Sequence, residues 1–164
     1  MRYVQKMRIR HLRGFTLIEL LVTVSIVAIL SAVAMPSFVA WINGSRVQNV
    51  SDGLLLSLMF ARNEAVKRKA AVAVVATNNN WADGWTVQLK SDGSILKKQI
   101  AFTKIAVTAT NTNVEYKNIG RVNAAVAPSF TVCDSDHSVG VTKRIVGVDL
   151  SGVPSVTKSG GCNQ

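Results

Sequence analysis

The strongest pattern in the sequence is an apolar run that follows a basic N-terminus. From Phe15 to Ile42, a stretch of 28 residues, Glu19 is the only charged side chain. About 20 apolar residues span a bilayer as a helix, so this run is long enough to do so. A carboxylate inside such a helix costs roughly 2.5–3.5 kcal/mol on insertion. Membrane anchoring alone does not explain that cost, so we expect Glu19 to have a role of its own.

A helical period continues beyond the apolar run. Apolar residues recur at spacings of three and four and form a stripe: Val47, Val50, Leu54, Leu58, Ala61 and Ala65. This spacing predicts one face of an amphipathic helix. We therefore expect one helix from Phe15 to about Lys69, apolar all round over residues 15–42 and amphipathic over residues 43–70. Pro36 and Gly44 weaken it locally.

After Ala70 the pattern changes to short strands separated by turns. Strands are predicted at Ala71–Thr77, Trp85–Lys90, Ser94–Ile100, Ile105–Thr110, Val114–Lys117, Phe130–Cys133 and Lys143–Leu150. The second and third of these form a predicted hairpin, and Ser151-Gly152 forms a predicted turn after the last strand. The expected fold class is α+β. The long N-terminal helix packs its stripe on an antiparallel, β-sandwich-like head of residues 71–164.

The charge distribution indicates which side of a membrane the head occupies. The formal net charge is +10, and five cations with no acid precede Phe15: Arg2, Lys6, Arg8, Arg10 and Arg13. Without residues 1–14 the balance is 14 minus 9, or +5. Lys and Arg next to a membrane span stay on the cytoplasmic side. The head is therefore expected in the periplasm or outside the cell.

The two cysteines, Cys133 and Cys162, both fall in the expected exported head. Disulfides persist in such a compartment. A bond that closes a loop of this length stabilises a fold by roughly 3–4 kcal/mol, and it would also hold the C-terminal tail. Two free thiols are the alternative.

One short segment gathers residue types that could carry chemistry. Cys133-Asp134-Ser135-Asp136-His137 combines a thiol, two acids, a hydroxyl and an imidazole. The only other histidine is His11, in the basic N-terminus, and the segment lacks the glycine and distal glutamate of a calcium loop. We also find no phosphate-binding glycine loop and no Gly-x-Ser-x-Gly elbow. A polar loop between strands is favoured, and no catalytic residue, metal ligand or cofactor is predicted.

The N-terminal residues resemble a known processing site. Arg13-Gly14-Phe15-Thr16-Leu17-Ile18-Glu19-Leu20 resembles the cleavage motif of type IV pilins and type II secretion pseudopilins. The resemblance implies that a prepilin peptidase cuts between Gly14 and Phe15 and methylates the new amine of Phe15. Residues 1–14 would then be a cytoplasmic leader. Glu19 would be the fifth mature residue and Pro36 the twenty-second, both with roles in filament assembly.

Two other interpretations of the N-terminus remain. Ala32-Val33-Ala34 is an A-x-A sequence after an apolar stretch, as in a secretory signal peptide. A plain single-span anchor is the other. The abrupt start of the run at Phe15, its length and the acid at Glu19 favour the pilin motif. Either Met1 or Met7 can be the start of the leader.

The remainder of the chain is similar to the GspH/FimT family of minor pilins and pseudopilins, which includes FimU-like tip subunits. The similarity rests on strands that appear only after the long helix and on a Phe130–Asp134 strand that pairs with a C-terminal cysteine. It implies a structural subunit near the tip of a type IV pilus, or of a type II secretion pseudopilus, that helps initiate assembly. The implied partners are other minor and major pilins or pseudopilins, the prepilin peptidase and the inner membrane. The head would be periplasmic before assembly and part of the filament afterwards.

The alternative function is DNA capture for natural transformation. Family members that act as DNA receptors carry a Gly-Arg-x-Arg motif near the C-terminus. The corresponding stretch here is Ser151-Gly152-Val153-Pro154-Ser155, in which Val153 and Ser155 replace both arginines. The candidates for phosphate contacts are Arg121, Lys143, Arg144 and Lys158. Four scattered cations are more typical of a solvated surface than of a nucleic-acid site.

Overall fold

The computed structural model describes residues 15–163. The chain divides after Pro36 into two units, Met1–Pro36 and Ser37–Gln164. Helix α1 (Leu17–Arg68) contributes to both units. Its first turn is capped by Thr16, whose Oγ1 accepts a hydrogen bond from the backbone N–H of Glu19 at 3.2 Å. A threonine at this position satisfies one of the unpaired donors of a helix start.

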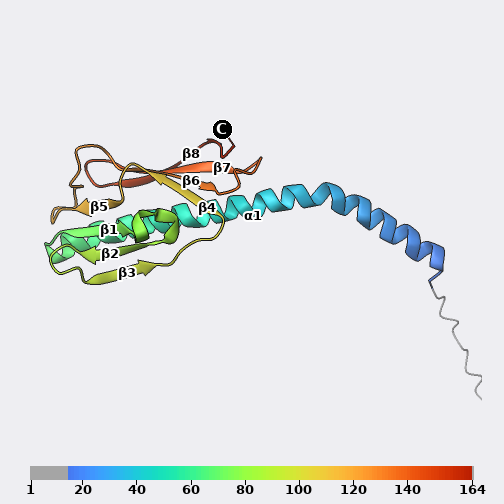
Figure 1. Ribbon diagram of the computed structural model, residues 1–164, viewed down its shortest axis with the longest axis horizontal. Coiled ribbons are helices and arrows are strands. Elements are labelled where there is room, and N and C mark those ends of the chain that lie inside the picture. The colour runs from blue at the N-terminus through green and yellow to red at the C-terminus, as the bar shows by residue number, and fades with distance from the viewer. Residues whose placement is uncertain (1–14, 164) are drawn as a thin grey trace, which may run out of the picture. The chain divides into compact units, whose positions relative to one another are not determined.

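The second unit holds two antiparallel sheets that share a core with the second part of α1 (Figure 1). The first sheet has the strand order β3-β2-β1-β5 and the second has the order β4-β6-β7-β8. The bounds are β1 Val72–Ala76, β2 Trp85–Leu89, β3 Ile95–Gln99, β4 Ile105–Ala109, β5 Asn113–Tyr116, β6 Ser129–Asp134, β7 Thr142–Val148 and β8 Pro154–Gly161. Two 3-10 turns, Thr77–Asn79 and Trp81–Asp83, join β1 to β2.

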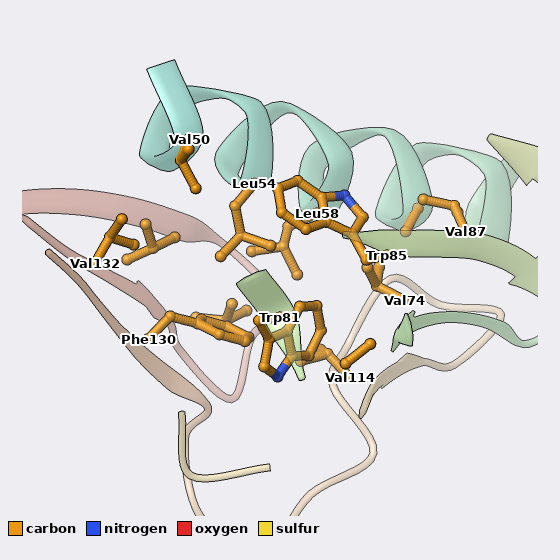
Figure 2. Packing of buried hydrophobic residues seen from close by; sticks show 14 of the residues in the cluster. Val50, Leu54, Leu58, Val74, Trp81, Trp85, Val87, Val114, Phe130 and Val132 are labelled. Carbon is orange, nitrogen blue, oxygen red and sulfur yellow. The ribbon is translucent and has the colours of Figure 1, made fainter. Parts of the chain in front are cut away.

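The predicted apolar stripe of α1 is the centre of the core. All six of its residues are at most 2% exposed: Val47, Val50, Leu54, Leu58, Ala61 and Ala65. Figure 2 shows Leu54 and Leu58 pointing from the helix into a cluster that includes Trp81, Phe130 and Val132. Burying one leucine side chain stabilises a fold by about 1.5–3 kcal/mol, so this stripe accounts for the docking of the helix. The expected α+β architecture is confirmed.

Aromatic side chains fill the space between the two sheets. Trp81 packs edge-on against Phe130, with ring centroids 4.7 Å apart, and its Nε1–H donates to the backbone oxygen of Asn111 at 2.8 Å. The ring centroids of Trp85 and Phe102 lie 5.5 Å apart. Edge-to-face pairs are favoured by the ring quadrupole. The tryptophan in the turn before β2 is therefore a core residue that fixes the two sheets against each other.

One strand was absent from the sequence prediction. Beyond the turn at Ser151-Gly152, residues Pro154–Gly161 form edge strand β8, which pairs with β7 from Val148↔Pro154 to Thr142↔Gly161. The segment begins with proline, ends in two glycines and is mostly polar, so its own β propensity is low. Pairing with β7 therefore determines that this segment forms a strand. The other predicted strands occur within two residues of their predicted bounds, and β2 and β3 pair as the expected hairpin.

Candidate functional site

The first unit exposes apolar side chains on every side of α1. Phe15 and Leu17 are each 80% exposed, and the same is true to a lesser degree of Ile18, Leu20, Leu21, Val22, Val24, Ile26, Val27, Ile29, Leu30 and Met35. An apolar surface of this extent marks a membrane or protein interaction site. No single helix in the described part of the chain meets the length and hydropathy expected of a membrane span. Only the segments Leu17–Ala32 and Ser37–Arg68 taken together do so.

Glu19 lies in the first turn of this apolar segment and is exposed. An acid there interacts favourably with the positive end of the helix dipole. Within residues 15–163 no cation lies within ion-pair distance of its carboxylate.

The other predicted processing and assembly residues are placed only in part. Gly14 and the leader lie outside the described residues, so the cleavage site stays a prediction, as do the choice between Met1 and Met7 and the position of His11. Phe15 is the first described residue. Pro36 lies inside α1, at the boundary between the two units.

The predicted disulfide between Cys133 and Cys162 is confirmed. It joins the end of β6 to the residue after β8, with a Cα–Cα distance of 5.5 Å, and both cysteines are buried. The backbone N–H of Cys162 also donates to the oxygen of Val141 at 2.9 Å, and its carbonyl lies 2.9 Å from Nδ1 of His137. Cys162 is therefore held by a covalent bond to β6 and by hydrogen bonds to the β6–β7 connection.

The segment that was considered for catalysis or metal binding has a structural role instead. Cys133 is a disulfide sulfur and is not a free nucleophile. Asp134 is buried, and its Oδ2 accepts from the backbone N–H of Ser138 at 2.8 Å. Ser138 in turn accepts from Asn43 of α1 at 3.2 Å. In the described part of the chain no group of three or more His, Cys, Asp or Glu side chains is placed to hold a metal ion.

The turn that corresponds to the DNA-receptor motif packs against the rest of the head. Gly152 has a φ of +89°, and a Cβ there would lie 2.0 Å from the carbonyl oxygen of Gly120. That same oxygen accepts from Arg62 Nε of α1 at 3.1 Å. Asp149 accepts from the Ser151 hydroxyl and the Val153 N–H, and these bonds hold the pKa of its carboxyl below the usual range. This glycine is thus required by the packing of the turn.

The four candidate cations do not form one surface. Arg144 and Lys158 lie directly opposite each other in the β7–β8 register, whereas Lys143 precedes Arg144 and so projects from the other face of the sheet. Arg121 lines a different cavity, beside Lys117 and Leu150. The structure therefore brings together two of the four. The sequence pattern does not show that Arg144 and Lys158 meet, because they do so through the pairing of β7 with β8, and β8 was not predicted.

Comparisons with known proteins agree with these features. The family profile described as Type II transport protein GspH matches residues 51–152, and the Prokaryotic N-terminal methylation motif matches residues 9–35. No curated protein matches the chain.

Two crystal structures of the type IV minor pilin FimU of Pseudomonas aeruginosa share the fold. In space group P21 the TM-score is 0.60 at 17% identity, covering 72% of this chain and 96% of FimU. In space group P65 the TM-score is 0.58 at 19% identity, covering 70% of this chain and 98% of FimU. The GspH match spans more than half of the sequence, so the chain belongs to the GspH family of type IV pilins and pseudopilins, which are structural subunits rather than enzymes.

Proposed function

We propose that this chain is a minor pilin that lies just below the tip of a type IV pilus and helps to initiate its assembly. The observation that carries the proposal is the exposed apolar first unit with a single acid, Glu19, in its first turn. The likeness of the head to FimU, a type IV minor pilin, is the reason to propose a pilus, and the type II secretion pseudopilus is the close variant because the family profile is that of a type II transport protein.

Maturation of the subunit precedes its assembly. The prepilin peptidase removes residues 1–14 on the cytoplasmic side and methylates the amine of Phe15. The subunit then waits in the inner membrane with its head in the periplasm. Other minor and major pilins are its partners in the filament.

Glu19 provides the specific contact of assembly. Its carboxylate pairs with the free amine of Phe15 on a neighbouring subunit, or on its own chain before assembly. In a low dielectric such a pair offsets much of the cost of burial, whereas an unpaired charge is strongly unfavourable. The pair also sets the axial register, because only one vertical offset brings acid and amine together. A subunit at the apex has no subunit above it that offers an amine and need not keep the acid, so retention of Glu19 supports a place below the apex.

A deletion strain tests this function. Cells that lack the chain should carry far fewer pili, and the wild-type gene should restore them while Glu19→Ala should not. Asp92→Ala is the matched control, because Asp92 is an exposed acid in the β2–β3 turn of the head. Normal piliation combined with a defect in type II secretion would assign the chain to a pseudopilus instead, and the neighbouring genes should agree with that result.

DNA capture is the second candidate, and the pairing of Arg144 with Lys158 is the observation in its favour. Valine and serine at positions 153 and 155 weigh against it. We expect the full chain in detergent to bind duplex DNA only weakly. Tight binding with a steep dependence on salt concentration would support DNA capture.

A further inference from the structure

A groove opens between α1 and the β7–β8 edge of the head. Its volume is about 370 Å³, which is sufficient for a small polar ligand. The helix contributes Trp41, Gly44 and Gln48, and the sheet contributes Thr142, Arg144 and Lys158. Nothing lies within 4 Å of the position that a Cβ on Gly44 would take, so the helix leaves the groove open there.

The charges in this groove are not balanced within the described residues. Arg144 and Lys158 are opposite each other in the β7–β8 register, and like charges at opposed positions destabilise a strand pair. Arg144 Nη1 lies 3.5 Å from Asp52 Oδ1, which offsets one cation. Within residues 15–163 Lys158 has no ion-pair partner. The groove therefore retains a positive charge that an anion would neutralise.

The aromatic residues beside the groove indicate where that anion comes from. Trp41 is 68% exposed and stacks on Phe38, with ring centroids 5.8 Å apart. An exposed indole is favoured at the headgroup level of a membrane. The apolar run from Phe15 to Ile42 has 28 residues, more than the ~20 that span a bilayer as a helix, and Trp41 lies at its C-terminal end.

We propose that this groove binds the phosphate headgroup of an anionic phospholipid while the subunit waits in the membrane. The phosphate lies between Arg144 and Lys158, and Trp41 contacts the glycerol region of the same lipid. The inference rests on the membrane-anchored state in the proposed function, and it concerns the head rather than Glu19. It assigns Arg144 and Lys158 to a lipid rather than to nucleic acid.

Fluorescence quenching by brominated lipids tests the proposal with the full chain in nanodiscs. Trp81 and Trp85 are buried in the head core, so quenching reports mainly on Trp41. Discs contain phosphatidylcholine and phosphatidylglycerol in equal amounts, with bromine on one lipid or on the other. We expect a roughly fivefold preference for phosphatidylglycerol next to Trp41, the effect of one surface cation near an anionic membrane. The double variant Arg144→Gln/Lys158→Gln should abolish that preference.

The matched control removes two cations outside the groove, with Arg121→Gln/Lys143→Gln. It should keep the preference; an equal loss in both double variants would show a general charge effect and overturn the proposal. Competition by excess inorganic phosphate would identify a free-anion site, and competition by duplex DNA a nucleic-acid site, and either result would overturn the lipid assignment. Equal quenching by both lipids would also refute it, without affecting the proposed function. Failure of the chain to enter any disc would contradict the anchored state itself.

Discussion

The two parts of α1 contain the same kinds of side chain in opposite surroundings. Leu17 and Leu20 are 80% and 61% exposed, whereas Leu54 and Leu58 are fully buried. The second pair faces two sheets of its own chain. The first pair has no such cover within the described residues of its own unit. One helix thus combines a segment that packs within its own head with a segment whose apolar side chains stay exposed, for which we propose lipid or other subunits as partners.

The angular spread of apolar residues around a helix indicates what kind of surroundings the helix needs. A stripe on one face, as in Val47–Ala65, is what a folded head can cover. An apolar surface on all faces needs a surrounding medium, and a bilayer or a helical bundle provides one. Glu19 is informative because it is the only charged residue in the run from Phe15 to Ile42, which is apolar on all faces.

The largest expected effect concerns the removal of the leader. Gly14→Val should block cleavage, because the peptidase is expected to require a residue without a side chain before the cut. Mass spectrometry should then find a chain heavier than the mature protein by the retained leader, about 1.8 kDa for residues 1–14, or about 1.0 kDa if the chain starts at Met7. A wild-type mature N-terminus at Met35 would instead indicate a secretory signal and contradict the pilin interpretation.

The disulfide should have the next largest effect, and only on the head. Cys162→Ser should lower the free energy of unfolding by about 3–4 kcal/mol, because the bond closes a loop with a sequence separation of 29. Chemical unfolding of the full chain in detergent, followed through the buried Trp81 and Trp85, measures this change. Cleavage of the leader should be normal in the same variant. Alkylation of both wild-type thiols without prior reduction would refute the bond.

Matched leucine substitutions sharpen the contrast between the two parts of α1. Leu54→Ala leaves a cavity in the core and should cost the head about 3 kcal/mol of unfolding free energy. Leu20→Ala removes the same atoms from an exposed position and should change it by less than about 0.5 kcal/mol. The same unfolding measurement serves both. Similar losses in the two variants would mean that the apolar segment is part of the head fold.

A smaller effect is expected from Glu64 near the end of α1. Its carboxylate accepts from Arg68 and also pairs with Lys67, and this lowers its pKa from the usual 4.5. The ionised form is therefore favoured by folding, so its contribution is present above pH 4.5 and is lost as the pH falls below that value. Between pH 5 and pH 3 the head should lose less stability in Glu64→Gln than in the wild type. Identical acid profiles would exclude the contribution.

Most of the fold could be predicted from local patterns, and the exceptions have physical causes. The stripe from Val47 to Ala65 and the hairpin of β2 and β3 are specified by periodicity and turn residues. β8 was missed because its sequence has little β propensity and pairing with β7 determines it. The groove beside Trp41 was missed for the same reason. Its two cations meet only through the register of β8, which begins more than a hundred residues after Gln48, the last groove-lining residue of α1.

We expect the first unit of the chain to act in assembly through Glu19, while the head folds independently of it. Immunoblots of sheared pili from cells that express Glu19→Ala test it most directly, with Asp92→Ala as the matched control. The Glu19→Ala protein should be cut, exported and as stable in its head as the wild type, yet strongly depleted from the filaments. Wild-type amounts of Glu19→Ala in sheared pili would exclude Glu19 from the mechanism of assembly.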